Sequence, residues 1–228
     1  MMVLHTATRY IWHSCALIIC TRQMMVLHTA TRYIWHSCAL IICSRQMMVL
    51  STTRWATQLG GGDVYYGDRS RADQMLLTYT SEPLAGDMEI TGSAVISLEI
   101  SSTHEDGAFI VYLEDLAPDG YVRMLAEGQL RAIHRAVSAA PTHATFGPFH
   151  SFASNDGQPM APGEITTLSF ALLPVSALVR EGHAIRVAIA GHDKDTFIRV
   201  PETGDPVIQV YRQQGNASWI DLPVMRKE

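Results

Sequence analysis

Residues 47–228 of this 228-residue chain contain no cysteine, so no disulfide framework can hold that part together. The chain also lacks any G-x-S-x-G motif, the strained strand-to-helix turn that carries many serine nucleophiles. It has no unbroken run of about 20 apolar residues, which a membrane-spanning helix needs, and no cluster of basic residues suited to nucleic acid. These absences exclude a nucleophile-elbow hydrolase within these residues, a membrane anchor and a nucleic-acid-binding protein.

Acidic residues are missing from the N-terminal part of the chain. Residues 1–46 contain four arginines and no acid. The whole chain holds 17 basic and 22 acidic residues, so residues 47–228 carry 17 − 4 = 13 basic and 22 acidic groups, a formal balance of −9. Such an acidic balance bears on solubility rather than on the fold. Together with the absence of cysteine, it fits a bacterial cytoplasmic protein.

What the N-terminal part does contain is a near-perfect tandem repeat. Residues 1–23 recur as residues 24–46 with one change, Thr21 to Ser44, and a third copy starts at Met47. Structural repeats usually drift in sequence while they keep their core pattern. Near-identity therefore indicates a recent duplication of DNA, and we expect residues 1–50 to be disordered or artefactual.

Three functional interpretations of the repeat are weaker. A signal peptide would need a cleavage site with small residues, and none follows the apolar run. Histidine and arginine interrupt every window that could form a transmembrane helix. His13, Cys15 and Cys20 could supply metal ligands, but their spacing matches no common zinc pattern.

The rest of the chain has the pattern of short strands. Apolar residues alternate with polar or small ones at positions 96–100, 168–172 and 185–189, which is typical of half-exposed strands of an antiparallel sheet. The continuous run Ala108–Leu113 predicts a central strand that is covered on both faces. Asp-Gly pairs at 106, 119 and 156 predict tight turns. The pattern predicts an all-β sandwich or jelly roll with no long helix, and at most one helical turn at Ser176–Glu181.

Two groups of residues could carry chemistry. His183, His192, Asp193 and Asp195 are close in sequence, but a hydrolytic triad also needs a serine beside the histidine. The carboxylates of Glu105, Asp106, Glu114, Asp115 and Asp119 could bind calcium if a hairpin brought two of them together, although Asp before Gly is ordinary turn chemistry. We therefore expect no catalytic residue, no cofactor and no metal site, and a structural role for His183.

Five segments resemble, in order, the C-terminal domain of the CocE/NonD hydrolases, the family of cocaine esterase and X-prolyl dipeptidyl aminopeptidases. Arg71–Gly92 resembles the opening of that domain, and TTRWATQLGGGDVYYGDRS (Thr52–Ser70) the connector before it. The later segments are LEDLAPDG (Leu113–Gly120) with EGQLRAIHR (Glu127–Arg135), EGHAIRVAIAGHDKDTF (Glu181–Phe197) and ASWIDLPVM (Ala217–Met225).

The resemblance implies a connector at residues 51–75 and a jelly-roll domain, similar to galactose-binding modules, at residues 76–228. In that family the catalytic serine, acid and histidine belong to a preceding α/β-hydrolase domain, for which the first fifty residues leave no room. This chain is then the non-catalytic part of an acyl hydrolase, inactive alone, that braces the hydrolase domain, walls its active-site cleft and supports homo-oligomers.

Residues 137–163 form a long excursion rich in proline, glycine, alanine and serine, and long ordered loops are often functional. The resemblance makes Trp55, Phe149 and Phe152 candidate contacts with the missing domain, against the simpler alternative of local packing. Two other hypotheses stay open for the whole chain. In the first, the chain is a stand-alone binding module for carbohydrate or a protein partner. In the second, it is the product of a disrupted gene and exposes an apolar patch.

Overall fold

The computed structural model describes residues 6–13, 24–28, 32–36, 40–43, 67–193, 197–213 and 215–225. Its elements confirm the all-β prediction, because strands alternate only with three short 3-10 helices in this part of the chain. The strands after the repeats are β5 (Leu77–Ser81), β6 (Met88–Gly92), β7 (Val95–Ser102), β8 (Ala108–Leu116), β9 (Val122–Arg131), β10 (Thr166–Ala171), β11 (Val175–Val179), β12 (Ala184–Ala190), β13 (Val207–Val210), β14 (Arg212–Gln213), β15 (Asn216–Ala217) and β16 (Trp219–Met225). The 3-10 helices are η1 (Ala72–Met75), η2 (Ala132–His134) and η3 (Ser154–Asp156).

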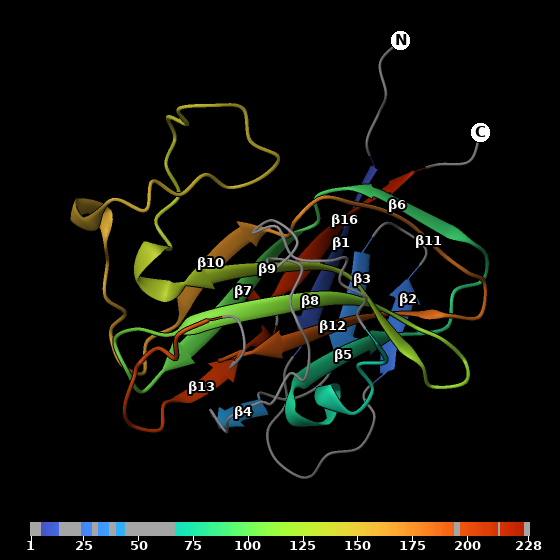
Figure 1. The fold of residues 1–228 in the computed structure, drawn as a ribbon, viewed down its shortest axis with the longest axis horizontal. Coiled ribbons are helices and arrows are strands. Elements are labelled where there is room, and N and C mark those ends of the chain that lie inside the picture. The colour runs from blue at the N-terminus through green and yellow to red at the C-terminus, as the bar shows by residue number, and fades with distance from the viewer. Residues whose placement is uncertain are drawn as a thin grey trace.

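Two antiparallel sheets face each other as a sandwich (Figure 1). One sheet has the order β5-β12-β8-β9. In the other, β7 pairs with β10 on one side and with both β13 and β16 on the other, and the sheet continues from β16 through β6 to β11. Within the described residues β9 pairs only with β8, and β11 only with β6, so each of these strands is the edge of its sheet.

Four strands lie in the repeated segment: β1 (Thr6–His13), β2 (Met24–His28), β3 (Arg32–His36) and β4 (Leu40–Cys43). The two copies of RYIWH pair in parallel with identical residues opposite each other, from Arg9 and Arg32 to His13 and His36. β1 also pairs with β16, β2 with β5, and β4 with β13. The remainder of residues 1–50 lies outside the described residues, and their artefactual origin stays a prediction.

The core lies between the two sheets and contains the residues that the alternation predicts. Ile96, Leu98 and Ile100 of β7 are completely buried, and they meet the inward side chains of β8, β10 and β12. Each large aliphatic side chain removed from water contributes about 1.5–3 kcal/mol, so this layer is the main source of stability.

The outward faces are more covered than the alternation predicts. The prediction for β8 is confirmed, since Ile110 and Tyr112 on its outer face are buried as fully as the inner residues. The prediction that β12 is half-exposed is wrong. Ala188 and Ala190 on its outer face are buried, and they pack against Ile110 and Tyr112 of β8. Leu76 and Phe197 pack against this cluster. Leu76 comes from a distant part of the chain and Phe197 from the segment after β12, and the alternation within β12 reveals neither. The helical turn predicted at Ser176–Glu181 is also wrong, because β11 pairs with β6 there.

At Gly128, β9 lies close to the backbone at the end of β10. A Cβ atom added there would lie 2.9 Å from both the carbonyl oxygen of Ala171 and the Cα atom of Leu172. We expect Gly128→Ala to lower the free energy of unfolding by about 1–3 kcal/mol, the usual cost of overpacking, as measured by urea denaturation. The matched control is Gly86→Ala, where nothing lies within 4 Å of the added atom. Equal stability of the two variants would contradict this prediction.

Candidate functional site

The residues that lead into the sandwich are held against it by a short chain of hydrogen bonds. The Asp68 carboxylate accepts from the backbone N–H groups of Ser70 and Val122, both at 2.9 Å. These bonds and one from the Ser70 hydroxyl hold the pKa of Asp68 below its usual range. The Arg69 N–H donates to the Val122 carbonyl at 3.0 Å. The chain is therefore fixed at the start of β9 before η1 begins.

A buried group of charges anchors the same segment to the outer face of the β5-β12-β8-β9 sheet. Arg69 Nε donates to Glu114 Oε1 at 2.6 Å, and Arg186 Nη1 lies 3.1 Å from Asp73 Oδ2. The Arg69 guanidinium carbon also lies 4.0 Å from the centre of the Tyr112 ring, in the geometry of a cation–π contact. The Glu114 side chain is completely buried, and the side chains of Arg69 and Asp73 are almost completely buried. We call Arg69, Asp73, Glu114 and Arg186 the junction cluster.

The junction cluster contains buried polar atoms that make no hydrogen bond, and one of them is a donor, Arg69 Nη2. Asp73 Oδ1 and Glu114 Oε2 are buried and without a hydrogen-bond partner. Burial, with the nearby Asp73 carboxylate adding to it, raises the pKa of Glu114 to about 8. A proton on Glu114 lets it donate a hydrogen bond to Asp73. The raised pKa favours the protonated form of Glu114 in the folded protein.

The last member of this buried region extends it toward the end of β12. The Tyr112 hydroxyl donates to Asp193 Oδ2 at 2.7 Å. Burial and the Asp193 carboxylate raise the pKa of Tyr112 above its usual range, so the phenol stays neutral. Asp193 therefore has a structural role, as the acceptor that satisfies a buried hydroxyl.

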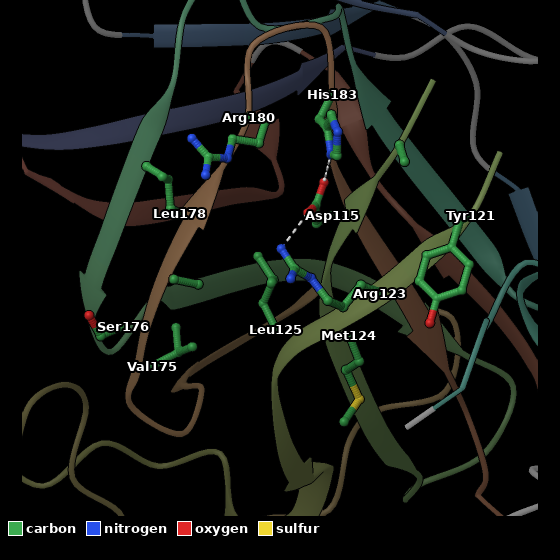
Figure 2. A pocket seen from close by; sticks show the side chains of 12 residues that line it. Asp115, Tyr121, Arg123, Met124, Leu125, Val175, Ser176, Leu178, Arg180 and His183 are labelled. Carbon is green, nitrogen blue, oxygen red and sulfur yellow. Dashed lines mark hydrogen bonds and ion pairs between the residues drawn. The ribbon is translucent and has the colours of Figure 1, made fainter. Parts of the chain in front are cut away.

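A shallow groove of about 700 Å³ runs between the edge strands β9 and β11 (Figure 2). At its base His183 Nδ1 lies 2.6 Å from Asp115 Oδ1, and Arg123 Nη2 donates to Asp115 Oδ2 at 2.8 Å. An imidazole oriented by a carboxylate is part of a hydrolytic triad, which also needs a nucleophile beside the imidazole. Ser176 lines the groove, but its hydroxyl is hydrogen-bonded to the Thr91 hydroxyl at 3.0 Å. The His183–Asp115 pair connects β8 to the start of β12, which supports a structural role for His183.

The structure separates the group of histidines and acids that are close in sequence. His183 immediately precedes β12, and His192 and Asp193 follow it. A seven-residue strand is roughly 20 Å long, so the two ends cannot form one site. Asp195 lies outside the described residues.

The candidate calcium ligands have other partners. Asp106 accepts from Arg131 Nε at 2.6 Å, and Asp119 from the Tyr121 N–H at 3.0 Å. In the part of the chain that the structure describes, no three His, Cys, Asp or Glu side chains are grouped so that they could hold a metal ion. No helix among the same residues is long and apolar enough to cross a membrane.

Two of the three candidate contact residues lie on the long excursion after β9, which stands away from the sandwich (Figure 1, yellow). Phe152 is 61% exposed, whereas Phe149 is partly buried with its ring edge-on to His143. Trp55 lies outside the described residues. Contact of these residues with another domain stays a prediction.

The described residues thus form a β-sandwich domain with a buried junction cluster and a His183–Asp115 pair, and none of their serines is hydrogen-bonded to that histidine. The family of the X-Pro dipeptidyl-peptidase C-terminal non-catalytic domain matches residues 44–221, and the chain belongs to this family. The domain occurs in CocE/NonD hydrolases, as the resemblance in the sequence implies.

Named relatives agree with this assignment. The chain is 50% identical over 176 residues to a Mycobacterium bovis protein named "Putative serine esterase", a match that covers 76% of the chain and 28% of the relative. It is 25% identical over 189 residues to the cocaine esterase of a Rhodococcus strain, covering 74% of the chain and 30% of that enzyme. A CocE/NonD family hydrolase from Staphylococcus aureus has the same fold, with a TM-score of 0.56 and 18% identity over 70% of the chain and 32% of that structure. The chain thus spans less than a third of each of these proteins.

Proposed function

We propose that this domain braces a hydrolase domain attached to its N-terminal side and forms one wall of the active-site cleft of that domain. The observation that supports the proposal is the junction cluster. It ties residues 69 and 73, in the last part of the connector, to β8 and β12 through a buried hydrogen bond to Glu114 and an ion pair with Arg186. A domain attached through such a joint has its orientation fixed, whereas a flexible linker would leave it free to rotate.

The junction cluster lies where the chain enters the sandwich, which is where a preceding domain would be attached. Relatives named as esterases or peptidases are more than three times as long as their match to this chain. If the additional length includes the catalytic domain, residues 67–76 connect the two domains and determine how they are oriented. Asp68, Arg69 and Asp73 fix that segment at both ends through bonds to Val122, Glu114 and Arg186.

A chimera tests this function. The part of the M. bovis relative that precedes its match would be joined to this chain from residue 52, and hydrolysis of a simple aryl ester would be measured. We expect an active chimera, and we expect a Gly/Ser insert of about ten residues between residues 66 and 67 to lower kcat/KM by roughly tenfold or more, because reacting groups lose their positioning. The same insert between Glu202 and Thr203, two exposed residues of the loop before β13, is the control and should leave the rate unchanged.

Two further measurements separate this function from the alternatives. The purified chain alone should not be labelled at any serine by a fluorophosphonate probe. Equal activity of the two inserted chimeras would contradict the bracing function. Binding of the chain alone to a glycan array, with no effect of either insert, would favour a stand-alone carbohydrate-binding module instead.

A further inference from the structure

The two sheets of the sandwich come together along β9, and one half of this seam is open. The Leu173 N–H, between β10 and β11, donates to the Glu127 carbonyl of β9 at 2.8 Å and divides the seam. On the β10 side, Phe149 and neighbouring residues of the excursion line a cavity together with Leu130 of β9 and Phe170 of β10. On the β11 side lies the groove of about 700 Å³, whose lining residues all come from β8, β9, β11 and the turns after β8 and β11. We propose that this groove binds an extended peptide segment of another protein, with both apolar and acidic side chains, as an added strand beside β11.

The floor of the groove is a margin of the hydrophobic core. Leu125 of β9 and Val175 of β11 are only partly buried, and both pack against the core. A register shift between β8 and β9 leaves Leu125 without a partner on β8, and bulges of this kind turn a side chain in a new direction. Figure 2 shows the Leu125 side chain between the ribbons of β9 and β11. Apolar side chains of a ligand would remove this surface from water, which favours binding.

The edge of β11 offers the backbone groups that an added strand needs. One edge pairs with β6 over all of Val175–Val179, and the other makes no backbone hydrogen bond to any residue that the structure describes. The facing strand β9 is already bonded at both ends of the groove. Its Val122 carbonyl accepts from the Arg69 N–H, and its Glu127 carbonyl from the Leu173 N–H. Because an exposed strand edge is a template for pairing with another chain, the added strand would pair with β11.

The rim of the groove is cationic, although residues 47–228 have an acidic balance. Among the described residues that line it, Asp115 is the only acid, and its side chain is 3% exposed and bound by Arg123 and His183. The side chains of Arg123 and Arg180 are 53% and 66% exposed. Arg180 is paired at 3.2 Å with Asp87, which lies outside the groove lining. Each of these ion pairs uses one nitrogen of a guanidinium that carries several N–H groups, so both arginines can still bind a carboxylate.

A short peptide in extended form matches the floor, the edge and the rim together. Its backbone would pair with β11, its apolar side chains would cover Leu125 and Val175, and a carboxylate would reach Arg123 or Arg180. Successive side chains of an extended chain point to opposite faces, so alternating apolar and acidic residues meet both needs. The groove shares no lining residue with the junction cluster, so peptide binding does not depend on the bracing function.

Synthetic peptides added to the full chain test the groove. The probe is fluorescein-labelled Thr-Val-Glu-Val-Glu-Val-Thr with an amidated C-terminus, and fluorescence anisotropy gives its Kd. We expect the same peptide with lysine in place of both glutamates to bind roughly tenfold or more weakly, because like charges then meet at the rim. A version N-methylated at each valine and glutamate lacks the backbone donors for β11 and should also bind roughly tenfold or more weakly. NMR should show that the glutamate peptide shifts backbone amides of β11, with those of β7, paired on both edges, as the reference.

Variants of the rim show whether its arginines bind the peptide. Arg180→Gln and Arg123→Gln should each weaken binding of the glutamate peptide roughly twofold to fivefold, the scale of one exposed ion pair. Arg71→Gln changes an exposed arginine outside the groove lining, so it is the matched control and should bind like the wild type.

Three results would overturn the proposal. The first is equal binding of the glutamate peptide and either its lysine or its N-methylated version, and the second is no binding of the glutamate peptide at millimolar concentration. The third is a dimer of the chain, seen by sedimentation velocity, that protects the β11 amides from exchange without any peptide, which would assign the groove to a second copy. The peptide comparisons use the wild-type chain, so they decide even if a variant does not fold.

Discussion

Arg69→Met is expected to lower the free energy of unfolding by about 1–3 kcal/mol near neutral pH, the usual cost of leaving a buried polar group without its hydrogen-bond partner. Methionine keeps much of the apolar stem of Arg69 but lacks the guanidinium that lies over the Tyr112 ring. It also offers no donor to Glu114 Oε1, which lies 2.6 Å from Arg69 Nε. The Glu114 and Asp73 carboxyl groups would then share only Arg186, whose guanidinium faces Asp73. Urea denaturation followed by tryptophan fluorescence would measure the loss.

Arg71 provides the matched control for Arg69. It is exposed, lies two residues further along the chain, and can be changed to methionine in the same way. We expect Arg71→Met to change stability by about 0.5 kcal/mol or less, as surface substitutions usually do. The double variant Arg69→Met with Glu114→Gln should regain part of the loss above about pH 8, where it leaves no Glu114 charge to bury. Similar losses for Arg69→Met and Arg71→Met would show that the junction cluster does not contribute to stability.

The sequence could predict the sandwich because its strands carry local signals. The alternation at Ile96, Leu98 and Ile100 follows from the two-residue period of a strand, and the structure confirms their burial. The Asp119-Gly120 pair forms the β8–β9 turn, where Gly120 has a φ of 92° that a residue with a side chain rarely adopts. The covering of β12 could not be predicted in this way, since it depends on Leu76 and Phe197, which lie outside the strand.

The junction cluster could not be predicted from local pattern either. Arg69 and Glu114 are 45 positions apart, and the Asp115–His183 contact joins residues 68 positions apart. One signal was present: Glu114 and Asp115 directly continue the apolar run of a strand that is covered on both faces. Buried acids need partners, so such a position predicts a buried cation without saying which one. Conversely, His183 and Asp193 are close in sequence but lie at opposite ends of β12.

The stability of this domain is expected to fall as the pH rises from about 4.5 to about 8, through Glu114 in the junction cluster. The pKa of Glu114 is raised from its ordinary 4.5 to about 8 by burial and by the Asp73 carboxylate. The folded state therefore binds a proton that the unfolded state has already released across this range, so the free energy of unfolding decreases by about 1 kcal/mol for each pH unit. Below the range both states hold the proton, and above it neither does, so the contribution is constant on each side.

Glu114→Gln should remove this dependence and raise stability at pH 8. The amide oxygen can still accept from Arg69, and the amide nitrogen can donate to Asp73 Oδ1 as the protonated acid does. Urea denaturation at intervals between pH 4.5 and pH 9 should give a difference between variant and wild type that grows with pH to several kcal/mol and levels off above pH 8. Glu105→Gln, at an exposed acid, is the control and should follow the wild-type curve. A wild-type curve parallel to that of Glu114→Gln would mean that Glu114 is ionised in the folded protein, in which case Arg69 and Arg186 together balance both acids of the junction.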